Sequence, residues 1–457
     1  MAVDIKDIID ISLSKEAFYN KYGRNKHLAA KTLGCKVNSY ETDYMIERFE
    51  EKGYEIVGEE EVADVYLINT CTVTKLSDRK SRQFIRRAKH NNPDAIVAVV
   101  GCYVQVAPEE VAAIEEVDII AGTADKYRVA DMCEDFIKNK KEKKIVEVDN
   151  IMNHRIYDEV SISNVEGRTR AYIKIQEGCN NYCSYCIIPF ARGPVRSRQI
   201  DDIVKEVKHI SAKGYKEIVL TGIHVASYGK DIKAYGLVDV IEQVAAVEGI
   251  ERVRLSSMEP TYVTADFIAR MEKLDNFCPH FHLSLQSGSD TVLQRMNRKY
   301  TTADYIQAVE NIRKVYPQAG ITTDIIVGFP GETESEFNET LAFVEKIKFS
   351  ELHVFRYSPR EGTKAAEMQD QVDGNIKNAR SNQLIELGKK EERRFREFYV
   401  GQEIDVLLEA TSEGKVEGYT KNYMKVEIEN GSHAQEGMIY RVQIIAYDGE
   451  VLKAQML

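Results

Sequence analysis

Between residues 168 and 360 the chain alternates short β-rich runs with helical segments, and this alternation constrains the fold more than any other feature. Each run has the length of a strand, and helical patterns such as "IDDIVKEVKHISAKG" separate the runs. The six runs are "RAYIKIQEG", "KEIVLTGIHV", "RVRLSSMEP", "HFHLSLQSG", "ITTDIIVGFPG" and "LHVFRYSP". Six β/α units in succession favour a partial (β/α)6 barrel over an open sheet, with the active site where the strands end.

A similar alternation precedes this barrel. The runs "LAAKTLG", "VYLINT", "IVAVVG" and "VDIIAGT" predict a Rossmann-like domain with a parallel sheet over residues 28–145. Residues 1–27 are predicted to be a helical, peripheral N-terminal extension of unknown role. The lysine-rich run "KNKKEKKIVEVDN" is most simply a solvated linker.

The end of the chain has a different pattern. Short alternating runs with glycine turns predict a small antiparallel β-barrel over residues 395–457. The partial barrel then occupies residues 165–390, and the whole is an α/β protein of three domains. A chain of 457 residues is long enough for two to four domains.

Composition narrows the classes of function. No apolar run reaches the length of a membrane span, and the N-terminus lacks the basic and apolar parts of a signal peptide. We therefore expect a cytoplasmic protein with no membrane partner. The net charge of −11 does not predict nucleic-acid binding, so any polyanion would need a local basic patch. Eight cysteines in a reducing compartment suggest metal binding or catalysis.

Three of these cysteines form one motif in the loop after the first run of the partial barrel. Cys179, Cys183 and Cys186 have the spacing C-x3-C-x2-C. A structural zinc requires four ligands, and no second pair of cysteines lies nearby. Three thiolates suit a 4Fe–4S cluster, in which one iron stays open to a substrate or cofactor. We favour iron–sulfur ligation over zinc, and zinc over unrelated thiols.

A second, dispersed set consists of Cys35, Cys71 and Cys102. Each follows a predicted strand of the N-terminal domain. Since ligand sites in parallel sheets gather beyond the carboxyl ends of strands, the three thiols can meet at one place. A single cysteine there would more simply be a buried small residue, but three favour a shared site.

The other candidate ligands are predicted to have structural roles. Cys133 lies on a helical pattern among apolar residues and Cys278 lies near a turn, so both are expected to pack in the core. Four histidines near predicted strands are expected to be core or rim residues rather than ligands. They are His224, His280, His282 and His353.

With both cysteine sets placed, the chain resembles the radical S-adenosylmethionine methylthiotransferases along most of its length. The C-x3-C-x2-C loop is similar to the cluster motif of that superfamily, and Cys35, Cys71 and Cys102 align with the ligands of the family's auxiliary cluster. Further similar blocks are "TLGCKVNSYETD", "NTCTVT", "VVGCYVQ", "FARGPVRSR", "HLSLQSGSDTVLQRMNRKYT" and "FRYSPREGTKAA". The C-terminal barrel resembles a TRAM domain, which in relatives contacts RNA.

The resemblance implies two 4Fe–4S clusters, S-adenosylmethionine and a 5′-deoxyadenosyl radical as the reactive species. The auxiliary cluster would carry or supply sulfur, and a second S-adenosylmethionine the methyl group. No amino-acid side chain is predicted to be catalytic. The family's frequent Gly-Gly-Glu is replaced by Thr221-Gly222-Ile223. Residues expected near S-adenosylmethionine are Ser256, Ser257, Glu259 and Gln286.

The substrate is indicated by the residues around the first cysteine. The run from Gly34 to Asn38, "GCKVN", resembles the bacterial branch that acts on N6-threonylcarbamoyladenosine beside the tRNA anticodon. The implied partners are the tRNA anticodon stem-loop and a reducing electron carrier, and we expect a monomer. The alternatives are isopentenyladenosine in tRNA, an aspartate of a ribosomal protein, or a non-enzymatic iron–sulfur sensor that binds RNA.

Two regions could contact RNA phosphates. The run "KLSDRKSRQFIRRAKH" after Cys71 is either a phosphate-binding helix or a solvated face, and Arg192, Arg196 and Arg198 are further phosphate or cofactor candidates. Residues 401–457 carry five basic and ten acidic residues, which argues against a purely electrostatic RNA clamp. Base stacking on Tyr419 or Tyr423 would be an alternative means of contact there.

Overall fold

The computed structural model describes residues 10–11, 13–139, 143–165, 167–412, 415–429, 431 and 434–457. By their contacts these residues form two compact units. The first comprises residues 1–163 with the segments 178–180 and 187–194, and the second comprises the remaining residues. Among the described residues, no helix is both long and apolar enough to cross a membrane.

The first unit contains one six-stranded sheet in which every neighbouring pair is parallel, as predicted. Its strands are β1 (Lys26–Thr32), β2 (Tyr54–Val57), β3 (Val65–Thr70), β4 (Ile96–Gly101), β5 (Ile119–Ala121) and β6 (Ile145–Glu147). The spatial order is β2-β1-β3-β4-β5-β6. The central strands β3 and β4 are buried at every residue, because helices cover both faces of the sheet.

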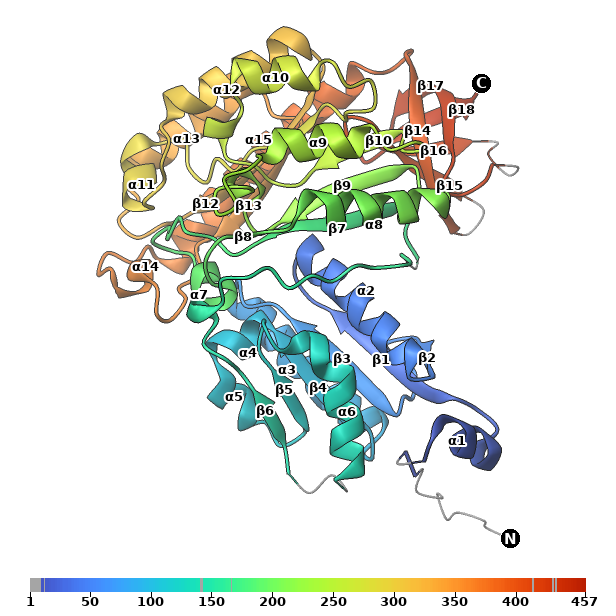
Figure 1. The fold of residues 1–457 in the computed structure, drawn as a ribbon. Coiled ribbons are helices and arrows are strands. Elements are labelled where there is room, and N and C mark those ends of the chain that lie inside the picture. The colour runs from blue at the N-terminus through green and yellow to red at the C-terminus, as the bar shows by residue number, and fades with distance from the viewer. Residues whose placement is uncertain are drawn as a thin grey trace. The chain divides into compact units, whose positions relative to one another are not determined.

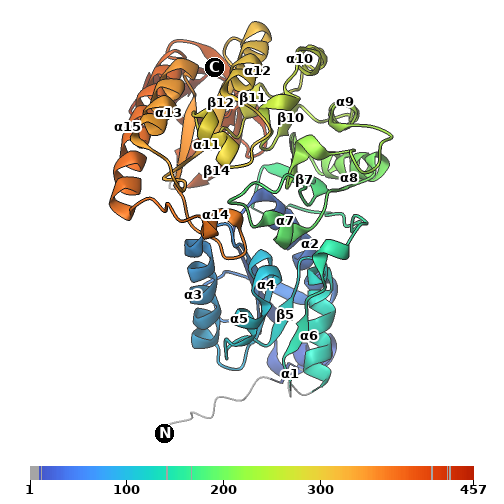
Figure 2. The same ribbon diagram turned by 90° about the vertical axis from the view of Figure 1, so that its left-hand side faces the viewer.

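The helices divide between the two faces (Figures 1 and 2). One apolar core joins the strands to α1 (Lys15–Tyr22), α2 (Lys36–Glu51) and α6 (Val129–Lys138). The other joins them to α3 (Lys75–Asn91), α4 (Cys102–Val106) and α5 (Pro108–Ala112). The remaining helical segments of this unit are η1 (Lys126–Arg128), η2 (Ile151–Asn153) and α7 (Ile188–Arg192). This is the doubly covered arrangement that the alternating pattern predicts.

The N-terminal extension and the linker differ from the predictions. Phe18 of α1 is fully buried in the first core, so this part of residues 1–27 is not peripheral. In the linker, Ile145–Glu147 pairs with β5 as an edge strand, because a short run of β-formers follows the lysines. Residues 1–9, 12 and 140–142 of these two segments lie outside the described residues.

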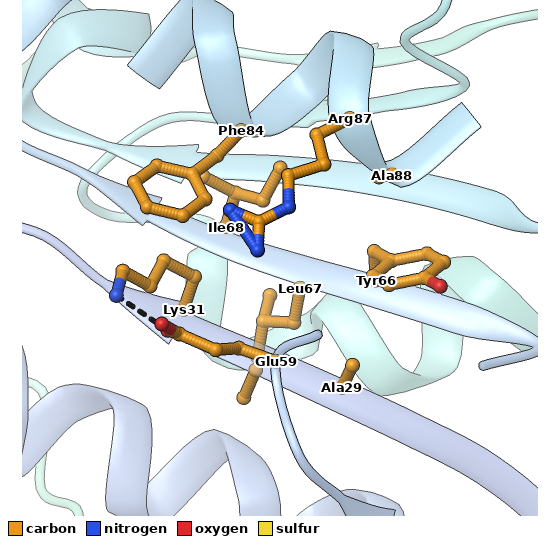
Figure 3. A pocket seen from close by; sticks show the side chains of 10 residues that line it. Ala29, Lys31, Glu59, Tyr66, Leu67, Ile68, Phe84, Arg87 and Ala88 are labelled. Carbon is orange, nitrogen blue, oxygen red and sulfur yellow. Dashed lines mark ion pairs between the residues drawn. The ribbon is translucent and has the colours of Figure 1, made fainter. Parts of the chain in front are cut away.

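Side chains of α3 lie over β1 and β3 and line a small pocket with them (Figure 3). The Lys31 ammonium pairs with Glu59 and lies 4.6 Å from the centroid of the Phe84 ring. Arg87 of α3 pairs with Glu60, and its guanidinium lies 5.8 Å from the same ring. Part of the basic sequence of this helix therefore serves packing and local ion pairs.

The second unit contains the predicted partial barrel. Its six parallel strands follow each other in chain order and are β7 (Arg170–Glu177), β9 (Glu217–Gly222), β10 (Arg252–Leu255), β11 (His280–His282), β12 (Gly320–Val327) and β13 (Glu351–Arg356). Parallel bridges at Val253–Phe277 and Met258–Leu283 continue the series from β10 to β11. A short strand, β8 (Arg196–Ser197), pairs antiparallel with β7.

Helical segments separate the strands of the partial barrel, as predicted. They are α8 (Ile200–Ala212), η3 (Val225–Ser227), α9 (Leu237–Ala245), η4 (Pro260–Tyr262), α10 (Ala265–Met271), α11 (Asp290–Arg295), α12 (Thr302–Val315) and α13 (Glu334–Ile347). Two more helices, α14 (Lys364–Glu367) and α15 (Gly374–Glu397), follow its last strand. Threonine caps with a reciprocal acidic residue begin α12 and α13, which sets their first residues locally.

A closed five-stranded barrel ends the chain, and it packs within the second unit. Its strands, in the order β14-β15-β16-β18-β17, are β14 (Glu403–Ser412), β15 (Lys415–Thr420), β16 (Lys425–Glu429), β17 (Ile439–Tyr447) and β18 (Leu452–Met456). All neighbouring strands in this barrel are antiparallel except β16 and β18, which are parallel.

Tyr419 and Tyr423 are half-buried, and their ring centroids lie 5.0 Å apart. The Arg170 guanidinium lies 4.6 Å from the ring centroid of Tyr419 and 5.0 Å from that of Tyr423. Arg254 and His280 also lie against the Tyr423 ring, at 4.7 and 4.8 Å. Because these contacts join the C-terminal barrel to the strands of the partial barrel, the two tyrosines do not form the open platform for RNA bases that their sequence suggested.

Candidate functional site

The three dispersed cysteines lie at one edge of the N-terminal sheet. Strands β1, β3 and β4 are neighbours, and Cys35, Cys71 and Cys102 lie in the segments that follow them. The register pairs Thr32 with Asn69 and Thr70 with Gly101, so the three strands end at the same level. The parallel topology therefore places the three loops side by side.

Gly34, just before α2, and Asn38, inside α2, allow the three cysteine-bearing segments to come together. Gly34 has φ +111°, and a Cβ at its position would lie 2.8 Å from Cβ of Cys71. Only glycine permits this conformation and so close an approach. The Asn38 side-chain amide donates to the carbonyls of Leu33 and Thr70, at 2.6 and 3.0 Å. These bonds tie the loop of Cys35 to the end of the strand before Cys71.

The three thiols are suited to bind a positively charged metal centre. Cys71 and Cys102 are buried, and Cys35 is exposed. Burial and the neighbouring thiols Cys102 and Cys35 raise the pKa of Cys71 to about 12, because adjacent thiolates repel in a low-dielectric environment. A coordinated cation reverses this preference and deprotonates its thiol ligands. The chemistry of the three donors therefore suits an iron–sulfur cluster.

A buried charge network lies beside these thiols. Arg192 is fully buried and donates from Nε to Sγ of Cys102 at 3.1 Å. Its Nη1 and Nη2 donate to the Glu41 carboxylate at 2.6 and 3.0 Å, and Nη2 also donates to Asn38. Lys126 pairs with the same carboxylate at 2.7 Å, and both side chains are fully buried. Arg192 thus connects the Cys102 thiol to the helix that follows Cys35.

Replacing Arg192 by methionine is expected to destabilise the first unit by about 1–3 kcal/mol, because buried acceptors on Glu41 and Asn38 lose their donor while Lys126 still neutralises Glu41. The matched control is Arg128→Met, which breaks a 3.0 Å pair with Glu147 on a side chain that is 64% exposed. That change should cost less than about 1 kcal/mol. Amide hydrogen exchange in β1, β3 and β4 measures the difference, and equal protection in the two variants would contradict the network's role.

The C-x3-C-x2-C loop follows β7. Its first part, with Cys179, belongs to the first unit, and its second part, with Cys183 and Cys186, belongs to the second. The Cys179 amide donates to the carbonyl of Gly193 at 3.0 Å. The Cys186 amide donates to the carbonyl of Cys183 at 3.0 Å, which forms a tight turn between these two thiols. Cys183 is buried, whereas Cys179 and Cys186 are partly exposed.

Cys183 is linked to a buried carboxylate by Arg298. Nη1 of Arg298 donates to Sγ of Cys183 at 3.2 Å, and Nη2 lies 3.2 Å from Glu259. His224 and Asn181 also bond to Glu259, at 3.1 and 2.8 Å. Burial opposes ionisation of Glu259, but the bond to His224 and the charge of Arg298 outweigh it and lower the pKa to about 2. Glu259 is therefore a carboxylate at physiological pH.

The four residues predicted near S-adenosylmethionine differ in their burial and in their contacts. Glu259 is in the network of Cys183. Ser256 is buried, and its hydroxyl has no hydrogen-bond partner among the described residues. Ser257 is exposed. Gln286 is buried with φ +68°, and its backbone bonds to Asp324 and Ile326 of β12.

Three members of this network were not predicted from the sequence. Asn181, His224 and Arg298 come from different loops, and His224 was expected to be a core or rim residue. No local motif indicates them, because 115 residues separate Arg298 from Cys183. Arg198, a phosphate candidate, is fully buried and paired with Glu206, and Arg196 is also buried. Neither of these two forms part of an exposed phosphate-binding surface.

The basic helix α3 keeps an exposed face. Its N-cap, Thr74, lies three residues after Cys71 and accepts a bond from the Ser77 amide. Arg82 and Lys89 are partly buried and pair with Glu110 and Asp118, each at 2.9 Å. The exposed basic residues are Lys75, Arg79, Lys80 and Arg86. This face is a candidate surface for an anionic partner.

Two family models match the chain. Residues 173–344 match the Radical SAM superfamily, and residues 27–122 match the Uncharacterized protein family UPF0004. The first match contains the C-x3-C-x2-C loop and runs from β7 to α13, so it includes every strand of the partial barrel except β13 and the first residues of β7. Membership of the radical SAM superfamily implies a 4Fe–4S cluster and S-adenosylmethionine, for which three thiolates with one open iron are a suitable ligand set.

Solved structures share the fold. The radical S-adenosylmethionine methyltransferase TsrM from Kitasatospora setae, with cobalamin and a 4Fe–4S cluster bound, superposes with a TM-score of 0.56 at 12% identity. The match covers 75% of this chain and 74% of that one. At this identity the similarity establishes the fold alone.

Curated relatives match almost the whole chain. Threonylcarbamoyladenosine tRNA methylthiotransferase MtaB from Bacillus subtilis is 45% identical over 92% of this chain and 93% of its own. The Aquifex aeolicus protein of the same name is 40% identical over 91% of this chain and 100% of its own. The chain therefore belongs to the radical S-adenosylmethionine methylthiotransferase family.

Proposed function

We propose that this protein replaces the C2 hydrogen of N6-threonylcarbamoyladenosine, next to the tRNA anticodon, with a methylthio group. The observation that carries the proposal is the convergence of Cys35, Cys71 and Cys102 in a unit that precedes the radical SAM barrel. Sulfur insertion needs a sulfur-carrying centre in addition to a radical source, and this second thiol set is suited to hold one. The names of the relatives at 38–45% identity support the same substrate.

The two thiol sets have distinct roles in this proposal. When bound, the cofactors supply a 5′-deoxyadenosyl radical, the inserted sulfur and the methyl group. Cys179, Cys183 and Cys186 would hold the cluster that binds S-adenosylmethionine, and Arg298 donates to one of these thiols. Glu259 offers a permanently charged carboxylate to a cationic group beside them.

The remaining residues support the second thiol set and the RNA. Arg192 donates to Cys102 and stabilises its thiolate form, since hydrogen bonds to a charged group favour that charge. The exposed basic face of α3 starts next to Cys71 and would bind phosphates of the anticodon stem-loop. We also propose that the C-terminal barrel is a TRAM domain that contacts RNA mainly by shape, since its residues carry a net negative charge.

Further parts of the proposal are predictions in their own right. They are an auxiliary 4Fe–4S cluster, a reducing electron carrier as partner, a monomeric enzyme, a cytoplasmic location and the domain boundaries 28–145, 165–390 and 395–457. A second candidate substrate is isopentenyladenosine in tRNA. A relative from Acetivibrio thermocellus named tRNA-2-methylthio-N(6)-dimethylallyladenosine synthase is 36% identical over 89% of this chain.

Mass spectrometry of tRNA nucleosides from a deletion strain tests the substrate. We expect 2-methylthio-N6-threonylcarbamoyladenosine to disappear and its unmethylthiolated precursor to accumulate. A plasmid with the wild-type gene should restore the product, and a Cys35→Ala plasmid should not. Loss of the methylthio group from isopentenyladenosine or from a ribosomal protein instead would assign the enzyme to another branch.

An assay of 5′-deoxyadenosine separates the enzyme from a non-catalytic sensor. The reconstituted protein, with dithionite and S-adenosylmethionine, should form 5′-deoxyadenosine. Absence of this product from a protein that holds about eight irons in two clusters would favour the sensor.

A further inference from the structure

Three neighbouring strands of the partial barrel bring two imidazoles and one carboxylate together. His282 ends β11, Asp324 lies on β12 and His353 lies on β13. The register pairs His282 with Thr322 and Asp324 with His353. Since side chains alternate along a strand, Thr322 and Asp324 share one face, and so do their cross-strand neighbours His282 and His353. The three side chains therefore belong to the same face of the sheet.

The opposite face of these strands packs in the core. Phe281, Thr323 and Ile325, which alternate with the three residues, are buried. His282 and Asp324 are partly exposed, and the His353 side chain is 44% exposed. A metal ion or a small ligand in solution can therefore reach the group.

The distances suit a single metal ion. One nitrogen from each histidine and one Asp324 oxygen all lie within 4.8 Å of one another. Nε2 of His282 is 3.2 Å from Oδ2 of Asp324. The two imidazole rings stack with centroids 5.7 Å apart and planes 28° from parallel. A hydrogen bond between His282 and Asp324 explains why these two side chains lie together. It does not explain why the His353 imidazole lies beside them.

Thr322 orients the His282 imidazole so that its Nε2 is available as a metal ligand. Nδ1 of His282 is 2.9 Å from Oγ1 of Thr322, which leaves Nε2 directed to Asp324. Metal-binding histidines commonly use their second ring nitrogen in this way. Glu351 adds a further negative group, 4.0 Å from Nδ1 of His353, and favours a cation over an anion at this position.

We propose that His282, Asp324 and His353 bind one divalent transition-metal ion, of the kind exemplified by Zn²⁺. Two imidazoles and a carboxylate are a ligand set for zinc, iron(II) and their neighbours, and three protein ligands leave a coordination position open. The site shares no residue with either cysteine set and contains no thiol. Its open position accepts water or an oxygen donor from a bound molecule.

Zinc titration of the reconstituted holoenzyme tests the site, because iron already occupies the thiols. Calorimetry and elemental analysis should find one Zn²⁺ per chain while the iron content stays constant. His353→Ala and Asp324→Asn should each raise the Kd for Zn²⁺ at least about 10- to 100-fold, since loss of an outer partner alone has that effect. Thr322→Val should produce a smaller increase.

The matched control is His209→Ala, an exposed histidine on α8 that should leave zinc binding unchanged. His353→Ala removes a half-exposed side chain, so it is the variant least able to disturb folding, and thermal melting checks this for each protein. The proposal is overturned if the wild-type holoenzyme takes up no Zn²⁺, or if His353→Ala binds it with the Kd of His209→Ala. Neither readout depends on methylthiolation.

Discussion

Replacing Cys179 by alanine is expected to reduce 5′-deoxyadenosine formation to background. In the proposed function the motif would supply three thiolates to a cluster with one open iron, so the loss of one ligand would leave two irons without a thiolate and the cluster would not be held. Iron content should fall from about eight to about four per chain, within the two-cluster proposal. Chromatography of the products with dithionite and S-adenosylmethionine measures the first effect, and iron analysis measures the second.

Cys133→Ala is the matched control for this experiment. Cys133 is a fully buried thiol in the first apolar core and belongs to neither cysteine set. The control should keep both the iron content and the cleavage of S-adenosylmethionine. Wild-type cleavage by Cys179→Ala would show that the C-x3-C-x2-C loop does not hold the radical-generating cluster.

Replacing Cys35 by alanine is expected to separate the two reactions. Reductive cleavage of S-adenosylmethionine should continue, whereas thiolation of tRNA should stop because the auxiliary cluster loses one of three ligands. Cys35 is the most suitable variant of its set, since it is exposed and its truncation leaves no cavity, unlike that of Cys71 or Cys102. Product analysis on an anticodon stem-loop, alongside 5′-deoxyadenosine, gives both readouts from one reaction.

The outcomes of the two cysteine variants differ in a diagnostic way. If Cys35→Ala retains full thiolation, the proposal of two clusters is wrong. If it loses cleavage as well, the two cysteine sets do not act independently. Iron analysis should again show about four irons remaining, which excludes general loss of cofactor.

Most of the fold was predictable from local sequence patterns. All six predicted strands of the partial barrel form, because each is an apolar run of strand length between helical segments. The edge strands β2 and β6 were missed, since short runs of partly exposed residues give a weak signal. The parallel closure of β16 on β18 was also missed, because strand pairing depends on chain path rather than on composition.

The charged residues were the least predictable. Arg192 and Arg198 were phosphate or cofactor candidates in the sequence, but both are fully buried against Glu41 and Glu206, so neither can be part of an exposed phosphate-binding surface. Arg192 lies instead beside the Cys102 thiol. A buried arginine needs a partner, and that partner can come from any part of the chain. In the same way, Tyr419 and Tyr423 stack on Arg170 because the C-terminal barrel packs on the strands of the partial barrel.

The α/β class, the strand series and the candidate ligands that lie close together in the chain could all be predicted from the amino-acid sequence. Hydrophobic periodicity and the spacing of Cys179, Cys183 and Cys186 are local properties, so they can be recognised in the sequence alone. The contacts of Arg298 with Cys183 and of Arg192 with Cys102 are visible only in the folded protein, as is the position of His282 and His353 beside Asp324. These contacts depend on strand register and on packing between distant segments, which local patterns do not specify.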